Sequence, residues 1–210
     1  MLIWDWNGTL LDDIGICLRG INQLLGRRSL QQLDLERYRR IFTFPVKDYY
    51  LAAGFDFSRE AFEVPAEEFI EEYGQLLPQA GLFPDVVQVL RFFRERNTRQ
   101  FILSAMEQRA LEASVAERDI RPFFEGVYGI GDNLANSKLL RGKELLADHG
   151  VQPRTALMVG DTLHDLEVAS SLGLGIMLVS RGHQHPGRLK GKGCKVFDDL
   201  TQLQTHFNGG

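Results

Sequence analysis

Short apolar runs alternate with helical patterns through most of the chain, and this alternation limits the folds open to it. Amphipathic patterns typical of helices separate the runs. Four runs fit short strands of a sheet: 100–103, 124–130, 156–159 and 175–179. Short apolar strands that alternate with helices favour an α/β fold, in which helices cover both faces of a parallel sheet.

A helical block separates these strands from an earlier one. Residues 2–6 form a predicted short buried strand. Apolar residues then recur at helical spacing, and no convincing strand is found in residues 33–81. We therefore predict a Rossmann-like parallel sheet core made of residues 1–12 and 83–210, with an inserted all-helical cap, residues 13–82.

Composition and charge argue against several classes of function. The net charge of −4 is spread over short mixed clusters, unlike the basic footprint of a nucleic-acid-binding protein. The two cysteines, Cys17 and Cys194, have no metal-type spacing, and so few of them indicate a reducing compartment. Neither a signal-peptide pattern nor a membrane-length apolar run is found. We expect a cytoplasmic protein, monomeric or homodimeric, that binds neither nucleic acid nor membranes.

Polar residues suited to catalysis follow the predicted strands at their carboxyl ends, where ligands bind in open α/β sheets. They are Asp5, Asn7, Thr9, Ser104, Asp161 and Asp165, with Lys138 at the start of a helix. A carboxylate can act as a nucleophile and form an aspartyl-phosphate. Grouped carboxylates bind Mg²⁺, and a lysine and a hydroxyl can hold phosphoryl oxygens. The set therefore indicates phosphoryl chemistry.

Four segments resemble, in order and spacing, the four motifs of the haloacid dehalogenase-like (HAD) hydrolase superfamily. They are WDWNGTLLD, FILSA, NSKLLRGK and VGDTLHD. The helical block is similar to the helical cap of the phosphoglycolate phosphatase-like branch. The resemblance implies a HAD fold and Mg²⁺-dependent hydrolysis of a small phosphorylated metabolite.

The resemblance also implies a role for each motif residue. Asp5 is similar to the nucleophile, which is also a metal ligand, and Lys138, rather than Lys143, resembles the motif-three lysine. The other metal ligands would be Asp161, Asp165 and the backbone carbonyl of Asn7. The residues that bind the phosphoryl group would be Gly8, Thr9, Ser104 and Lys138.

Asn7 departs from the family pattern. HAD phosphatases usually carry a second aspartate there, which protonates the leaving alkoxide and later activates water. An amide is neither a useful acid nor a useful base, and such help is worth ~100- to 10,000-fold in rate. The metal site is unaffected because its ligand at this position is the backbone carbonyl.

Three explanations of Asn7 stay open. The protein can be a phosphatase whose acid is weakened or relocated, for example to His164 or to a cap residue. It can instead cleave a C–P bond, as the phosphonoacetaldehyde hydrolase branch does, with Lys47 of the cap forming a Schiff base. For either reaction, Lys47 and Tyr50 are the candidate cap residues that face the substrate. It can also bind a phosphorylated ligand without catalysis. A dehalogenase is disfavoured because such enzymes need no Mg²⁺, whereas the acidic pair of VGDTLHD is intact.

The remaining candidates are expected to be exposed or to pack. His183 and His185 lie in a loop with glycine and proline and should face solvent, and His164 should be exposed beside the site. Two aromatic pairs should pack: Trp4 and Trp6 on the strand face opposite Asp5, and Phe42 and Phe44 in the cap core.

Overall fold

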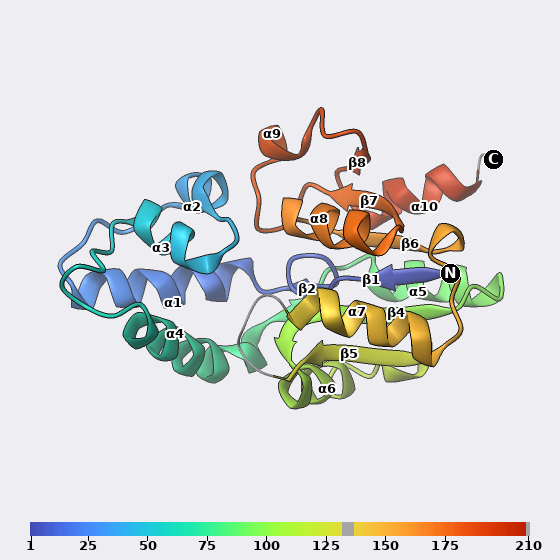
Figure 1. Ribbon diagram of the computed structural model, residues 1–210, viewed down its shortest axis with the longest axis horizontal. Coiled ribbons are helices and arrows are strands. Elements are labelled where there is room, and N and C mark those ends of the chain that lie inside the picture. Colours follow the sequence, from blue (N-terminus) through green and yellow to red (C-terminus); the bar gives the residue numbers. More distant parts are fainter. Residues whose placement is uncertain (132–136, 209–210) are drawn as a thin grey trace.

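The computed structural model describes residues 1–131 and 137–208 of the chain. Within these residues, six parallel strands form one sheet in the order β5-β4-β1-β6-β7-β8 (Figure 1). The strands are β1 Leu2–Trp4, β4 Gln100–Glu107, β5 Gly126–Ile130, β6 Leu157–Gly160, β7 Gly175–Val179 and β8 Lys195–Phe197. The predicted parallel sheet is confirmed, and the first predicted strand lies near its centre, between β4 and β6.

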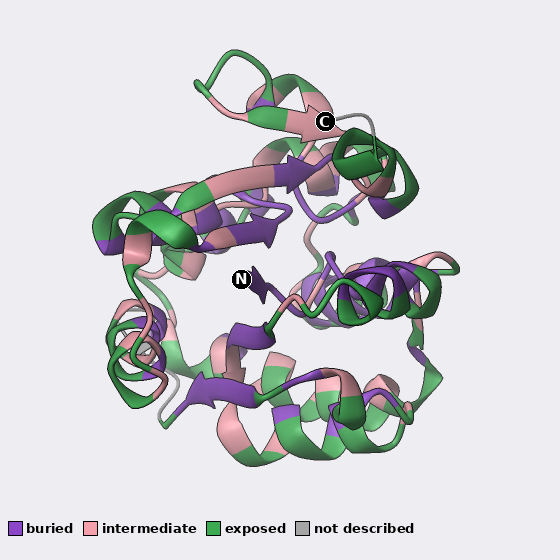
Figure 2. Ribbon diagram, turned by 90° about the vertical axis from the view of Figure 1, so that its right-hand side faces the viewer, coloured by how far each residue is buried: buried purple, intermediate pink, exposed green. Residues whose placement is uncertain are grey.

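Helices cover both faces of the sheet, so that β1, β4, β5 and β6 are largely buried, whereas β7 and β8 at one edge are partly exposed (Figure 2). The helices of the core are α5 Val86–Glu95, α6 Gln108–Ala116, α7 Ser137–Asp148, α8 Leu163–Leu172, the short α9 Pro186–Leu189 and α10 Leu200–Asn208. Apolar side chains of α5, α6 and α10 pack in one cluster with those of the sheet, and those of α7 and α8 pack in another. The two clusters are the two layers that the α/β pattern predicts.

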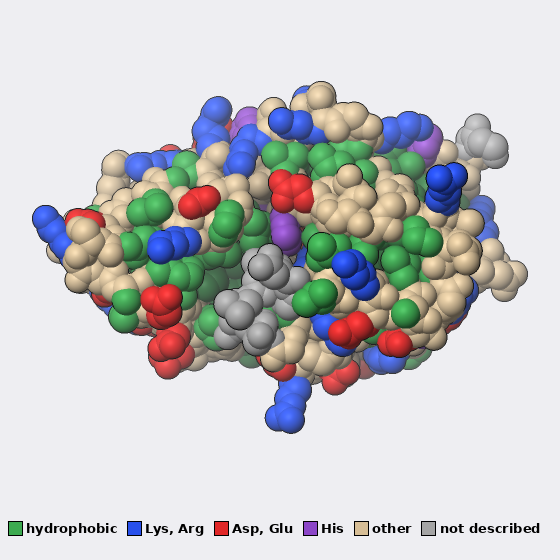
Figure 3. All heavy atoms as spheres, in the orientation of Figure 1, with side chains coloured by type: hydrophobic (Ala, Val, Ile, Leu, Met, Phe, Trp, Pro, Cys, Tyr) green, Lys and Arg blue, Asp and Glu red, His purple; other side chains and the backbone are tan. Residues whose placement is uncertain are grey.

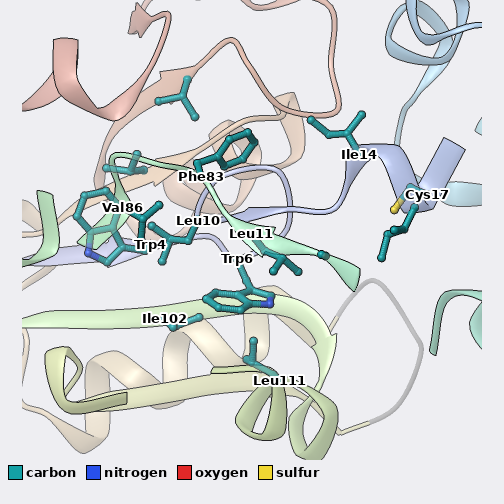
Figure 4. Packing of buried hydrophobic residues seen from close by; sticks show 14 of the residues in the cluster. Trp4, Trp6, Leu10, Leu11, Ile14, Cys17, Phe83, Val86, Ile102 and Leu111 are labelled. Carbon is teal, nitrogen blue, oxygen red and sulfur yellow. The ribbon is translucent and has the colours of Figure 1, made fainter. Parts of the chain in front are cut away.

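β1 sends its side chains alternately to the two layers, and this alternation positions the site. Trp4 and Trp6 are fully buried in the cluster with α5 and α6, whereas Ile3 belongs to the cluster with α7 and α8. Figure 4 shows Trp6 close to Ile102 of β4. Asp5, which follows β1, is therefore directed toward the side of α7 and α8, as the period of two predicts.

The helical region lies at the left of Figure 1 and comprises four α-helices in the described chain. They are α1 Ile14–Arg27, α2 Leu35–Ile41, α3 Val46–Ala53 and α4 Glu63–Leu76. The chain enters this region after β2 (Leu11–Asp12) and leaves it through β3 (Gly81–Leu82), which pairs antiparallel with β2. The division into a separate core and cap stays a prediction.

β3 corrects the expectation that residues 33–81 hold no strand, because Gly81 begins it. Two residues are too few to show a period of two. The partner strand, β2, lies about seventy residues earlier in the chain, so the pairing leaves no local pattern.

No helix among the described residues combines the length and the apolar character needed to span a membrane.

Candidate active site

Three buried carboxylates meet at the carboxyl edge of the sheet. Asp5 follows β1, Asp161 follows β6, and Asp165 lies in the first turn of α8. β1 and β6 are adjacent and parallel, so their ends coincide. One oxygen from each carboxylate lies within 4.8 Å of the others. The structure thus brings together the acids that the sequence assigned to one site.

Lys138, the second residue of α7, joins this group. Its Nζ donates to Asp5 Oδ1 at 2.5 Å and to Asp165 Oδ1 at 2.7 Å, and the side chain is buried. Lys143, one and a half turns further along α7, is exposed. Lys138 is therefore the α7 lysine that contacts the carboxylates.

The three carboxylates together carry more charge than the single Lys138 ammonium can neutralise. Burial raises the pKa of Asp5 well above its usual value, and the charges of Asp165 and Asp161 add to this although Lys138 opposes it. Burial and the charge of Asp165 raise the pKa of Asp161 to about 6. Burial also acts on Asp165, but Lys138 and Thr162 outweigh it, so the pKa of Asp165 is lowered. Three buried carboxylates facing one ammonium leave excess negative charge.

A divalent cation fits this arrangement. The available donors are carboxylate oxygens, and hard ions such as Mg²⁺ prefer oxygen ligands. A cation would also offset the repulsion that raises the pKa of Asp5 and Asp161. The donor set therefore suits Mg²⁺.

Gly8 and Thr9, which follow β1, lie close to the Asp161 carboxylate. Gly8 has a φ of +71°, and a Cβ there would lie 2.5 Å from Asp161 Oδ2 and 2.5 Å from the ring of His183. Thr9 Oγ1 is buried 3.2 Å from Asp161 Oδ1 and 3.4 Å from Asp5 Oδ2. One hydroxyl proton can serve only one of these two acceptors at a time.

Ser104 lies beside Asn7, at the point where the pairing of β4 with β5 shifts register. Its Oγ accepts from the backbone N–H of Met106 at 3.0 Å and lies 3.4 Å from Asn7 Oδ1. The N-terminal cap of α6 is Glu107, which accepts from two backbone N–H groups. Glu107, and not Ser104, therefore caps α6.

The amide of Asn7 is bonded to a buried acid, Asp13. Asn7 Nδ2 donates to Asp13 Oδ2 at 2.8 Å and to the Tyr73 hydroxyl at 2.8 Å, and that hydroxyl donates to Asp13 Oδ2 at 2.9 Å. The backbone N–H of Gly8 donates to Asp13 Oδ1 at 3.0 Å. Burial raises the pKa of Asp13, but His183 and these donors outweigh it, so its pKa is lowered. The carboxylate of Asp13 thus lies next to Asn7, the position at which HAD phosphatases usually carry an aspartate.

His183 corrects the expectation of a solvent-facing loop, because it is buried in the site. Its Nε2 lies 3.2 Å from Asp13 Oδ1, its Nδ1 lies 2.8 Å from the Tyr38 hydroxyl, and its backbone N–H donates to Asp161 Oδ2 at 2.6 Å. Burial lowers its pKa, but the charges of Asp13 and Asp161 outweigh this and raise the pKa to about 9. The loop follows β7 at the same sheet edge, and that position was the sequence signal that could have placed His183 in the site.

His185, which was also expected to face solvent, is half-buried, with its Nε2 3.4 Å from Glu36 Oε1.

Two phenylalanines of the helical region lie against histidines of the core. Phe44 stacks on His164 with ring centroids 4.6 Å apart, and Phe42 stacks on His183 at 5.0 Å. The side chain of His164 is only 16% exposed, which corrects the expectation that it is open to solvent. Phe42 and Phe44 line the site rather than forming only a cap core.

A cavity of about 350 Å³ opens beside these residues, between the core and the helical region. Asp5, Asn7, Lys138 and Asp161 line it on the core side, and Tyr50 lines it on the other. Figure 3 shows hydrophobic side chains gathered on both sides of this junction. Lys47 does not line the cavity. It is exposed, with Nζ 5.7 Å from the ring centroid of Phe57.

The close approach at Gly182 gives a test of the metal site. A Cβ there would lie 2.1 Å from Asp161 Oδ2 and must displace that carboxylate. We expect Gly182→Ala to weaken Mg²⁺ binding by about 10- to 100-fold, measured by titration calorimetry. Gly187→Ala, in the short helix α9 that follows this loop, is the control, because a Cβ there meets only the His185 ring. Unchanged affinity in Gly182→Ala would contradict the placement of Asp161 in the metal site.

Comparison with known proteins gives consistent matches. A family model described as haloacid dehalogenase-like hydrolase matches residues 2–179. The chain is 26% identical over 181 residues to a phosphoglycolate phosphatase of Synechococcus elongatus, covering 86% of this chain and 84% of that protein. It is 28% identical over 215 residues to the probable phosphatase IndB of Dickeya dadantii, covering 95% and 89%.

Solved structures share the fold at lower identity. A haloacid dehalogenase-like family protein of Streptococcus pneumoniae matches with a TM-score of 0.85 at 18% identity, covering 98% of this chain and 97% of that chain. A mutant of CbbY from Rhodobacter sphaeroides, solved with xylulose-(1,5)bisphosphate, matches with a TM-score of 0.71 at 17% identity, covering 96% and 95%. These likenesses establish the arrangement of the elements.

Proposed function

The chain belongs to the haloacid dehalogenase-like hydrolase family, and from that premise we propose that it hydrolyses a small phosphomonoester through an aspartyl-phosphate on Asp5. The observation that carries this is the buried group of Asp5, Lys138, Asp161 and Asp165 at one sheet edge. The relatives named phosphoglycolate phosphatase make phosphoglycolate the first candidate substrate.

The reaction follows from these residues. A carboxylate oxygen of Asp5 attacks phosphorus, the bond from phosphorus to the leaving oxygen breaks, and the departing alcohol takes a proton. Lys138 and the Thr9 and Ser104 hydroxyls would hold the phosphoryl oxygens. Mg²⁺, held by Asp5, Asp161, Asp165 and the Asn7 carbonyl, would neutralise part of the phosphoryl charge. Water then attacks the phosphorus of the acyl phosphate, the bond between phosphorus and the Asp5 oxygen breaks, and inorganic phosphate leaves as the Asp5 carboxylate is restored.

We propose that the Asp13–His183 pair supplies the proton that Asn7 cannot. Asp13 Oδ2 lies 2.8 Å from the Asn7 amide, and the pair lines the same cavity as Asp5. An acid that holds and orients a histidine is a recurring proton-transfer device in enzymes. The proton would come from His183, whose pKa is raised to about 9, and the Asp13 carboxylate, which follows β2, would hold and orient the ring.

The rival C–P chemistry has less support. It needs a lysine amine in the cavity, and Lys47 is exposed and lies outside it. Among the described residues, the lysine that lines the cavity is Lys138, and its Nζ already donates hydrogen bonds to the carboxylates of Asp5 and Asp165. Borohydride trapping with phosphonoacetaldehyde tests this directly, and an adduct on Lys47 would reinstate the rival.

Turnover of p-nitrophenyl phosphate tests the proposed function. We expect hydrolysis with Mg²⁺, loss of it with EDTA, and recovery on adding Mg²⁺ back, because the ion offsets charge at both the carboxylates and the phosphoryl group. Phosphate esters that raise the melting temperature but are never hydrolysed would instead show a binding protein.

A further inference from the structure

The wall of the cavity opposite the carboxylates is apolar and aromatic. Its side chains come from the helical region and from the end of β4, and they include Phe42, Phe44, Val46, Phe69, Ile70 and Met106. Phe42 and Phe44 pack edge to face with ring centroids 5.7 Å apart, and each ring also stacks on a histidine of the core. A ligand group in this part of the cavity is therefore surrounded mainly by carbon.

The same wall offers no free cation to an anionic substrate tail. None of the described cavity-lining residues is an arginine, and the lysine among them, Lys138, already contacts Asp5 and Asp165. His183 faces the carboxylate of Asp13. Residues 132–136 add no lysine or arginine, since their sequence is DNLAN. A second carboxylate on the substrate would therefore be buried without a countercharge, which is costly.

Two buried polar atoms of the described cavity lining lack a hydrogen-bond partner, His164 Nε2 and the Tyr49 hydroxyl. His164 lines the cavity under the ring of Phe44. Small-molecule sites commonly combine an apolar wall with a few such polar groups, which orient the ligand. His164 can therefore hydrogen-bond a polar atom of the substrate near the ester.

We propose that the leaving group of the substrate is an uncharged apolar or aromatic alcohol rather than a short carboxylic acid such as glycolate. This rests on the proposed function, because it concerns the alcohol part of the same phosphomonoester. The aromatic wall would bury that group, and the hydroxyl released on hydrolysis would remain next to the cavity lining. The reaction that supplies the substrate would then be phosphorylation of an apolar alcohol.

Two pairs of probes test the proposal. Benzyl phosphate and phosphoglycolate differ in the tail while both release an alkyl alcohol, and we expect kcat/KM to be about 10- to 100-fold higher for benzyl phosphate. In 2-phenylethylphosphonate and 3-phosphonopropionate a methylene replaces the ester oxygen, so neither can be hydrolysed. Calorimetry with the Mg²⁺-loaded protein should show the same order of affinity and does not depend on turnover.

A variant can reverse the preference. Ile70 lines the cavity on α4 and is 47% exposed, so Ile70→Arg adds a cation without burying it in the core. We expect this variant to lower the benzyl-to-glycolate ratio in kcat/KM and in affinity at least tenfold. Val64→Arg is the matched control, because Val64 is 44% exposed on the same helix but does not line the cavity.

The outcomes separate this inference from the proposed function. If phosphoglycolate is hydrolysed faster than benzyl phosphate, the apolar substrate class is wrong and the phosphatase stands. If no ester is hydrolysed but 2-phenylethylphosphonate binds more tightly than 3-phosphonopropionate, the phosphatase is wrong and the apolar preference stands. Tighter binding of 3-phosphonopropionate in the wild type would overturn the inference with or without turnover.

Discussion

Asp5→Asn should lower phosphomonoester turnover by at least about a thousandfold, the scale on which loss of a catalytic nucleophile acts. The amide cannot form the acyl phosphate. The fold should persist, because Lys138 keeps its contact with Asp165 at 2.7 Å when the Asp5 charge is removed. Removing one of three clustered carboxylates also relieves the repulsion that raises the pKa of Asp5. The measurement is kcat/KM for p-nitrophenyl phosphate with saturating Mg²⁺.

Asp12→Asn is the matched control for this variant. It makes the same chemical change in the same segment, but Asp12 is exposed on β2 and outside the carboxylate group. We expect near-normal turnover from it, and unchanged melting curves for both variants would exclude misfolding. Equal turnover by wild type and Asp5→Asn would remove Asp5 as the nucleophile.

Asp13→Asn should have the next largest effect, and that effect should depend on the leaving group. For alkyl phosphates we expect kcat/KM to fall by about 100- to 10,000-fold, because a poor leaving group needs a proton. For p-nitrophenyl phosphate the fall should be small, because nitrophenolate departs unprotonated. kcat/KM is the informative constant, since it reports the steps up to release of the alcohol and not the later attack of water.

Two further variants separate proton transfer from a structural role of Asp13. His183→Gln keeps a polar side chain in the loop and should give the same dependence on the leaving group. Asn7→Asp in the Asp13→Asn background restores a carboxylate at position 7 and should recover alkyl phosphate turnover. Equal losses on both classes of ester, without recovery by Asn7→Asp, would show that Asp13 only holds the structure together.

The residues predicted from sequence share one property: local patterns determine their positions. Asp5 and Asp161 each follow an apolar strand, so a period of two and a strand end were enough to place them at one edge. Lys138 was placed in the same way, by the start of a helix. The predicted parallel sheet rests on the same local signals, and its strand order brings these residues together.

The residues that sequence analysis missed depend on distant segments folding back. His183 contacts Tyr38 from 145 positions away and Asp13 from 170 positions away. Its place after a predicted strand was the one local signal, and many histidines of solvent-exposed Gly/Pro loops share that signal. Phe42 and Phe44 likewise pack against histidines that come late in the chain, so their place in the cavity wall depends on how the helical region meets the core.

The two tryptophans flank Asp5, the proposed nucleophile, and this gives the protein a built-in optical reporter. Trp4 and Trp6 are the chain's whole tryptophan content, and both are fully buried on either side of Asp5 in sequence. Emission excited at the red edge of the spectrum therefore arises entirely from residues bonded to Asp5 along the backbone. We therefore expect stopped-flow fluorescence of the unlabelled wild-type chain to report Mg²⁺ binding and the proposed phosphorylation and dephosphorylation of Asp5.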